Sequence, residues 1–546
     1  MKQQRNQTNF RRMFGDRVTR FERDESGSLI AFSLFIFICM VMFGGIAVDL
    51  MLYENQRTHL QNSTDRAVLA AANLDQTVDP KVVVQDYLAK SGIIIDVDDV
   101  TVTEVGSMPV ITGRQVSVDI DGDFNTMLMN MVGVDTLPLG ALSEATEAIN
   151  DIEVSLVLDV SGSMGSNQKL ERMQDAANDF VAEILAGAED GRVSMSLVPY
   201  STQVSAGPEL LAQMNTEHNH DYSHCVNFAG SSFSSVAIDH TVALSQTAHF
   251  DPWRHYNSGQ SPRNYVCRNE SYFDILPWTN DIAALTNQIN AFEDGGNTSI
   301  DVAVKWGAAL LDPSMSSQLD ALITSGDVPA EFAPRPFSYT RDDTLKFIVV
   351  MTDGINTTQY YLDDPYKEGQ SPIYVDTATG RISTDDREWQ DRDNDDDWWE
   401  DYWYAPGRYW IDNPYDSDGG GNSSEAVRLD WLDVWATMSV RWRAYHLHYK
   451  QYNNASDYYD NYNNSNGPRR SISASTKETR MDNICSAAKD EGVVIFAIGF
   501  EVTDSSADVM RDCASTPNHF YRVEGLDIEY AFASIANQIN QLKLTQ

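Results

Sequence analysis

The sequence predicts an α/β protein whose main part is a doubly wound, Rossmann-like domain with large insertions, preceded by one transmembrane helix and a small α+β unit. Two patterns predict this class. An uncharged apolar stretch runs from Leu29 to Val48, and from residue 151 onward short apolar runs alternate with amphipathic helical segments. Alternating strands and helices are typical of a sheet covered by helices on both faces. The 546 residues leave room for two to four domains.

The apolar stretch LIAFSLFIFICMVMFGGIAV is long enough to cross a hydrocarbon core as a helix. Residues 1–25 carry seven Lys or Arg against four acids, and Asp49 and Glu54 follow the stretch. The positive-inside rule therefore predicts a cytoplasmic basic tail (1–28), an anchor (29–52) and an external remainder. A cleaved signal peptide is the alternative, but its apolar region would be unusually long and lacks a clean cleavage site at its end.

Residues 53–150 are predicted to form a stalk helix and a small α+β unit. The helix is expected to continue from the membrane to about Leu74. The further elements expected here are a helix at 79–91, strands at Val100–Val105 and Gln115–Ile120, a helix at Phe124–Val132, and either a strand or a helix at Leu142–Ile149.

Residues 151–546 are predicted to form the large domain. The run EVSLVLDVSGSM is apolar until it ends in a polar loop, as in a buried parallel strand. The other predicted strands are Arg192–Tyr200, 345–354, 493–500 and His519–Val523, and helices follow the first strand and close the chain. Insertions are expected at about 205–277, 312–342 and 355–475. The last one holds eight of the eleven tryptophans, which argues for an ordered segment.

The net charge of −41 argues against nucleic-acid binding, because such a surface repels polyanions. Cys39 lies in the apolar stretch, which leaves Cys225, Cys267, Cys485 and Cys513 in the exported body. An even number of scattered cysteines there predicts two disulfides. We favour the local pairing, Cys225 with Cys267 and Cys485 with Cys513, while the two other pairings stay open.

Oxygen-bearing side chains gather where predicted strands end. Asp159, Ser161 and Ser163 form a D-x-S-x-S motif at the end of the first strand of the large domain. Thr298 follows Gly295-Gly296 at the start of a helix, and Asp353 ends the apolar run 345–351. Ligands bind at the carboxyl ends of strands in such sheets, and hard oxygens suit Mg²⁺, Ca²⁺ or Mn²⁺. Each residue alone is also explained as a helix cap or a turn.

The order D-x-S-x-S, GG-x-T and strand-TDG resembles the metal-ion-dependent adhesion site of von Willebrand factor A domains. The resemblance covers roughly 152–546 without the insertions. It implies one divalent cation, Mg²⁺ first and Ca²⁺ or Mn²⁺ as alternatives, with one coordination position open to a partner's carboxylate. The five positions that match the family's metal ligands are Asp159, Ser161, Ser163, Thr298 and Asp353.

The N-terminal part resembles TadG-type proteins of Flp (tight-adherence) pilus systems. The similarity is carried by the Gly before the span, the Val-Asp after it and the segment LQNSTDRAVLAAA. It implies a single-pass protein of the bacterial inner membrane, with a cytoplasmic N-terminus and a periplasmic body. The C-terminal region, with Cys485, Cys513 and a closing helix, is also similar to TadG proteins with an A domain, which implies that these two cysteines are disulfide partners.

Two other features are weaker candidate sites. Asp391, Asp393 and Asp395 alternate as in a calcium loop, but Asp396 and Tyr402 stand where its Gly and bidentate Glu belong, so a solvated acidic face is favoured. The tryptophans and tyrosines of 355–475 predict either a binding surface or a locally packed core.

The functional prediction is a membrane-anchored, non-enzymatic binding or adhesion module in Flp pilus assembly. It would coordinate one divalent cation and capture an acidic group of a protein partner, with pilus-assembly components as candidate partners. The alternative is a structural cell-envelope scaffold whose metal only stabilises the fold. Neither H-E-x-x-H nor a Walker loop nor a dinucleotide fingerprint is present, so no catalytic residue is predicted.

Overall fold

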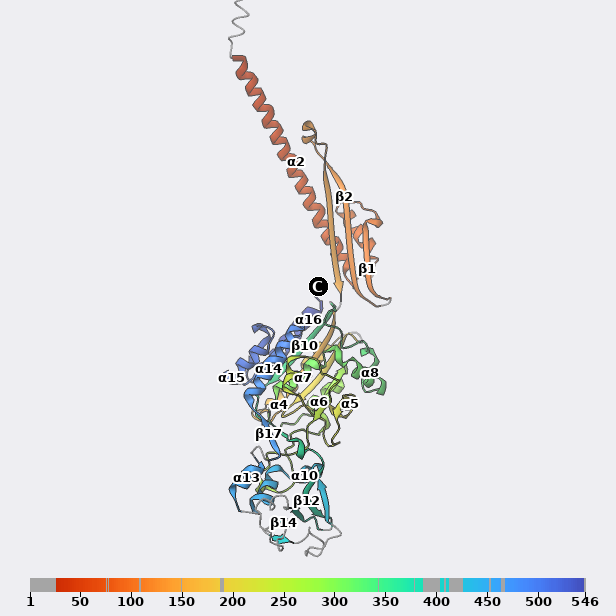
Figure 1. Cartoon of the computed structure of the whole chain (residues 1–546). Coiled ribbons are helices and arrows are strands. Elements are labelled where there is room, and N and C mark those ends of the chain that lie inside the picture. Colours follow the sequence, from red (N-terminus) through yellow and green to blue (C-terminus); the bar gives the residue numbers. More distant parts are fainter. Residues whose placement is uncertain are drawn as a thin grey trace, which may run out of the picture. The chain divides into compact units, whose positions relative to one another are not determined.

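The computed structural model describes residues 26–74, 76, 78–107, 110–148, 150–186, 191–341, 343–377, 379–385, 403–406, 409–411, 426–450, 453–462 and 467–544 (Figure 1). These residues form two compact units, and the second begins at Asn150. Each unit has its own sheet and its own apolar core.

The N-terminal unit is a long helix packed on a three-stranded antiparallel sheet of order β1-β2-β3. Ala67, Val68 and Ala71 of the helix share a core with Val116 and Val118 of the sheet, so the small residues of LQNSTDRAVLAAA are the ones that let helix and sheet approach. The elements are α2 (Ser26–Ala72), α3 (Pro80–Lys90), β1 (Val100–Ser107), β2 (Val110–Asn125) and β3 (Thr136–Ala148).

Within the described residues, α2 is the one helix long and apolar enough to cross a membrane, judged by length and composition. The apolar side chains of its first half are exposed; Leu34 and Phe35 are examples. One continuous helix joins this half to the half that packs on the sheet.

The helix expected at Phe124–Val132 is wrong. β2 continues through Asn125, and only Met129–Val132 form a short 3-10 helix, η2, between β2 and β3. The segment stays in a strand because Phe124 is buried beside Leu60 and Leu139, which keeps it on the two-residue period of the sheet. The segment from 142, for which both strand and helix are open from the sequence, belongs to strand β3.

The second unit contains a six-stranded sheet of order β19-β18-β10-β4-β5-β9. All neighbouring strands are parallel except β9, which is antiparallel to β5 at the edge. The strands are β4 (Asp151–Asp159), β5 (Val193–Tyr200), β9 (Leu276–Thr279), β10 (Thr344–Thr352), β18 (Val494–Phe500) and β19 (Phe520–Val523). The doubly wound α/β class is confirmed, and β9 is a sheet strand that the sequence did not predict.

Helices cover both faces of this sheet (Figure 1). Alternate residues of β4 enter different cores: Leu156 and Leu158 pack with α4, α6 and α16, whereas Val157 packs with α7 and α14. This alternation is the reason why the strand is apolar throughout. The helices are α4 (Lys169–Leu185), α6 (Ile282–Asn290), α7 (Ile300–Ala309), α8 (Ser316–Ser325), α14 (Ala474–Asp490), α15 (Asp504–Cys513) and α16 (Asp527–Leu544).

Two insertions carry small sheets of their own. Between β5 and β9 lie helix α5 and a three-stranded sheet; between β10 and α14 lie a two-stranded ribbon and a five-stranded sheet of order β15-β14-β13-β12-β16. The elements are α5 (Gly207–Ala212), β6 (Thr216–Glu217), β7 (Val226–Asn227), β8 (Leu244–Gln246), β11 (Gln359–Leu362), β12 (Gln370–Asp376), β13 (Ile382–Asp385), β14 (Trp403–Ala405), β15 (Tyr409–Ile411), β16 (Ala426–Asp430), α10 (Trp431–Thr437), α11 (Val440–Arg443), α13 (Ala455–Tyr462) and β17 (Arg469–Ile472).

Part of the aromatic-rich insertion is a packed core. Trp431, Trp435 and Trp442 are buried together, with Phe250 from the earlier insertion beside them. For these tryptophans the locally packed core explains the aromatic content. The calcium-loop candidates Asp391 to Tyr402 lie outside the described residues.

Both disulfides have the local pairing. Cys225 is bonded to Cys267 within the first insertion, and Cys485 of α14 is bonded to Cys513 of α15. Cys39 is a free thiol on α2.

Candidate functional site

The two acidic residues predicted for the site lie side by side because their strands do. β4 and β10 are parallel neighbours, with Leu158 opposite Met351, so Asp159 and Asp353 leave the same edge of the sheet on adjacent strands. Ser161 precedes the short 3-10 helix Gly162–Gly165, which turns the chain back across this edge.

The Asp159 carboxylate is completely buried and held by two hydrogen bonds. One oxygen accepts the backbone N–H of Ser161 at 2.8 Å, and the other accepts the Thr352 hydroxyl at 2.7 Å. Burial, followed by the negative charge of Asp353, raises the pKa of Asp159 to about 6. The Asp159 carboxylate therefore holds its negative charge where water does not reach, which is costly unless a cation is near.

The hydroxyl groups link the two carboxylates. The Ser161 and Ser163 oxygens are 3.2 Å apart, and the Ser163 hydroxyl donates to Asp353 Oδ1 at 2.6 Å. Asp159, Ser161, Ser163 and Asp353 thus form one continuous hydrogen-bonded cluster. Ser163 is exposed, so the cluster opens to solvent at this residue.

Thr298 is tied to the cluster through backbone contacts between loops. The N–H of Gly162 donates to the Gly296 carbonyl at 3.1 Å, and the N–H of Gly295 donates to the Val160 carbonyl at 3.0 Å. Gly296 has a φ of +82°, and a Cβ there would lie 2.7 Å from the Thr202 hydroxyl, so this position of the loop requires a glycine. Thr298 itself is buried at the start of the segment that leads into α7.

A lysine that the motif did not predict neutralises one of the carboxylates. Lys169, the first residue of α4, donates to Asp353 Oδ2 at 3.0 Å and lies 3.8 Å from Glu501. A lysine six residues after the D-x-S-x-S loop was the available signal, but α4 had to be placed before its ammonium could be assigned to Asp353.

A second lysine, Lys477 of α14, fixes the Thr298 loop. Its ammonium donates to the Thr298 carbonyl at 2.8 Å and to the Thr357 carbonyl at 3.0 Å, and it lies 3.8 Å from buried Asp301. Burial lowers the pKa of Lys477 to about 8 and raises that of Asp301. Because Thr357 follows β10, Lys477 connects the two loops that carry Thr298 and Asp353.

The donor set has a definite chemical character. Two carboxylates and three hydroxyls are hard oxygen donors, and their charge of −2 is balanced only in part by the ammonium of Lys169. Such a set fits Mg²⁺, Ca²⁺ or Mn²⁺ rather than a thiophilic ion. Across the described parts of the chain, no three or more His, Cys, Asp or Glu side chains gather as a metal site. This site differs because three of its five proposed ligand residues bear a hydroxyl rather than a carboxylate.

The chain thus joins an apolar helix to an α/β domain with an oxygen-rich cluster at the carboxyl edge of its sheet. Residues 27–74 match the family model of Flp pilus-assembly TadE/G-like proteins. This match covers α2 and leaves the large domain unassigned. No curated protein matches the chain.

Several solved structures are similar to the chain at low identity. The vWF domain of the type V pili tip protein Mfa5 from Porphyromonas gingivalis is 15% identical with a TM-score of 0.31, over 73% of this chain and 98% of that one. The adhesive tip pilin GBS104 from Group B Streptococcus agalactiae is 14% identical with a TM-score of 0.29, over 71% and 99%. The pilus adhesin SpaC from Lactobacillus rhamnosus GG is 12% identical with a TM-score of 0.30, over 81% of this chain and 34% of that one. Similarity at this level decides nothing about function.

Proposed function

We propose that the large domain is a binding module of the von Willebrand A type, which coordinates one divalent cation and captures an acidic group of a protein partner. The observation that carries the proposal is the cluster of Asp159, Ser161, Ser163 and Asp353 at the ends of β4 and β10. The metal would be held by these four residues and by Thr298.

Three features of the cluster support a cation. Among the described residues Asp159 is buried with no ion-pair partner, and it accepts the hydroxyl of Thr352. The three loops are held in place by contacts outside the donor set, namely the Gly162–Gly296 hydrogen bond and Lys477. Such support by surrounding groups is what positions metal ligands. A bound dication would supply electrostatic attraction for a carboxylate at the open side, where Ser163 is exposed.

We place this module in the cell envelope, in a pilus-related role. The match of residues 27–74 to the TadE/G-like family and the length of the apolar helix support an inner-membrane anchor. The basic tail before the helix supports a cytoplasmic N-terminus and a periplasmic body. Components of pilus assembly are the partners that we would test first.

We also propose that the cluster performs no catalysis. The hydroxyls of Ser161 and Ser163 contact each other and the carboxylate of Asp353. In this proposal Ser163 and Asp353 are ligands of the cation rather than a nucleophile and its general base.

The test uses the full-length protein in nanodiscs. Asp159→Asn should abolish binding of Mg²⁺ and Mn²⁺ in calorimetry, because it removes a buried negative charge from the donor set. The matched control is Asp320→Asn on the exposed surface of α8, which should bind both ions as the unmodified protein does.

A pull-down from envelope extract, with Mg²⁺ or with chelator, then tests the partner. Capture that requires Mg²⁺ and is lost in Asp159→Asn supports the binding module. If the protein binds metal but captures the partner equally well with chelator or with Asp159→Asn, the metal has only a stabilising role, as in the scaffold alternative. Unchanged metal affinity in Asp159→Asn would refute the metal site itself.

A further inference from the structure

The turn between β2 and β3 is an apolar surface on the N-terminal unit. We call residues Met127–Val132, with the sequence MLMNMV, the hairpin tip. Met127 is 71% exposed and Met131 69%, and Leu128 and Val132 are also exposed. The eleven residues Phe124–Val134 contain no charged side chain, in a chain in which 22% of residues are charged. Solvent is therefore an unfavourable environment for this turn.

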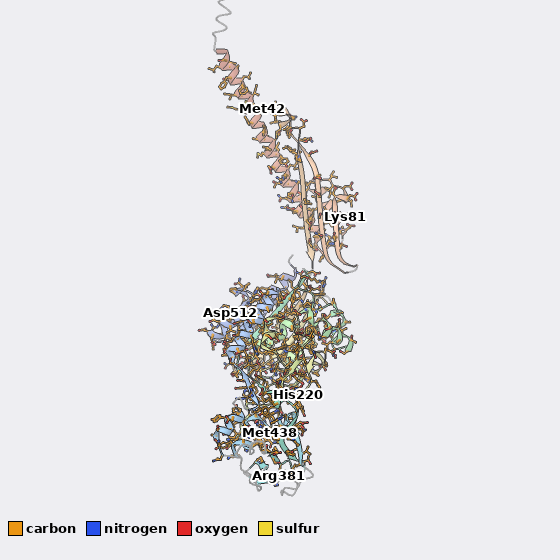
Figure 2. The ribbon with its side chains drawn as sticks, viewed as in Figure 1. Met42, Lys81, His220, Arg381, Met438 and Asp512 are labelled. Carbon is orange, nitrogen blue, oxygen red and sulfur yellow. A yellow bond between two sulfur atoms is a disulfide. The ribbon has the colours of Figure 1, made fainter. Side chains whose placement is uncertain are left out.

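The hairpin tip is attached to α2 at a defined position along the helix, between Gly45 and Asp49. The Asp49 carboxylate is fully buried and accepts the backbone N–H groups of Met127, Leu128 and Met129 at 3.2, 2.7 and 2.6 Å. One turn earlier, a Cβ on Gly45 would lie 2.9 Å from the Cβ of Leu128, so only a glycine permits this approach. Figure 2 marks Met42 on the same stretch of α2.

This point of attachment lies at the end of the apolar half of α2. Gly45 and Asp49 bracket Val48, the last residue of the uncharged stretch. At 1.5 Å per residue, the Gly45 contact is about 5 Å inside the end of this stretch. If Leu29–Val48 cross the membrane, the hairpin tip reaches the acyl chains of the leaflet nearest the body.

The surroundings of the hairpin tip agree with this depth. On the membrane side, α2 exposes the apolar side chains of Val41 and Met42, and Val48 is exposed at the level of the tip itself. On the other side, a cleft of about 430 Å³ between α2 and the end of β2 is lined by the polar Asn55, Gln56, His59 and Asn125 and by the apolar Leu52, Phe124 and Met127. Polar lining begins where the headgroup region would begin.

We propose that the hairpin tip is a second membrane contact, which inserts Met127, Leu128, Met131 and Val132 among the lipid acyl chains beside α2. The proposal rests on the membrane anchor of the proposed function. Asp49 makes the insertion possible, because it satisfies three backbone N–H groups that would otherwise face lipid unpaired. The contact fixes the height and tilt of the N-terminal unit at the membrane surface, which a single helix alone does not do.

The experiment places a fluorescent label at single cysteines of the full-length protein in lipid vesicles, in a Cys39→Ser background. Met131→Cys reports on the hairpin tip and Leu34→Cys on the anchor. Leu142→Cys is the matched control, an exposed apolar side chain on β3 about 20 Å along the strand from the turn. Quenching by nitroxide-labelled lipid is compared with quenching by aqueous iodide.

We expect lipid quenching at positions 34 and 131 and iodide quenching at 142. Gly45→Leu should displace the hairpin tip, so that the label at 131 loses lipid quenching while the label at 34 keeps it. Iodide quenching at 131 with lipid quenching at 34 would overturn the inference and leave the anchor intact. Iodide quenching at 34 would overturn the anchor as well. Protection of 131 from both quenchers would mean that protein, such as a second copy, covers the tip, which also overturns the proposal.

Discussion

Removal of the Lys169 ammonium should strengthen binding of a divalent cation at the proposed site. Lys169 contacts Asp353 Oδ2 at 3.0 Å, so it occupies one oxygen of a proposed ligand and adds a positive charge to the site. Lys169→Met removes that charge and keeps most of the length of the side chain, and Met is well tolerated in a helix.

The size of the effect follows from Coulomb's law. A dication held by the Asp353 carboxylate would lie roughly 5 Å from the ammonium, given metal–oxygen bonds of about 2.0–2.6 Å. The repulsion is about 2 kcal/mol at the dielectric constant of water and about 7 kcal/mol at the lower value common near protein surfaces. Because Ser163 opens the site to solvent, we expect the lower end, which is a gain of at least about tenfold in affinity.

Calorimetric titration of Mg²⁺ and Mn²⁺ into full-length Lys169→Met measures this gain. Arg172→Met is the matched control: it removes one positive charge from the same helix, but Arg172 contacts Glu501 at 3.9 Å rather than Asp353. Its affinity should change much less. An affinity of Lys169→Met that is unchanged or weaker, in a protein that melts cooperatively, would refute the placement of a cation at Asp353.

Two further predictions concern the support of the site. Lys477→Met leaves Asp301 buried without the ammonium beside it and should lower the free energy of unfolding, measured in denaturant melts, by about 3–5 kcal/mol. Lys489 is a partly exposed lysine of the same helix, so Lys489→Met should be nearly neutral in the same melts. Equal losses in the two variants would contradict the role of Lys477. The pKa of Asp159, raised to about 6, means that the folded metal-free protein binds a proton more tightly than the unfolded chain. Its contribution is therefore present near pH 4 and is lost as the pH rises through 6, by up to about 3 kcal/mol. With chelator present, the free energy of unfolding of the unmodified protein, relative to that of Asp159→Asn, should fall between pH 4 and pH 7. Addition of Mg²⁺ should restore it at pH 7. A difference between the two proteins that does not vary with pH would contradict the raised pKa of Asp159.

The order and character of the main elements could be predicted from the chain itself. The buried strands are apolar on both faces, so β4, β10 and β18 appear as uninterrupted runs in the sequence. Polar residues directly after such runs mark the carboxyl edge of the sheet, which is why the sequence pattern alone assigns Asp159 and Asp353 to one site. The apolar helix could be predicted from its length and lack of charge alone.

Other features depend on contacts between distant segments, and local patterns do not contain them. Lys169 and Lys477 look like ordinary helix residues until α4 and α14 bring their ammonium groups to Asp353 and the Thr298 carbonyl. The segment Phe124–Val132 has no clear two-residue period, so the sequence predicts a helix where Phe124 in fact extends a strand.

By itself, then, the sequence determined the apolar helix, the buried strands β4, β10 and β18 and the five oxygen-bearing positions, because burial and strand ends produce local patterns in a sequence. Only the tertiary structure decided which charges those positions meet and where the hairpin tip lies on α2. Both depend on side chains between about 80 and 190 residues apart, such as Asp49 with Leu128 and Lys169 with Asp353. An electrostatic or packing contact of that kind forms only after the chain has folded.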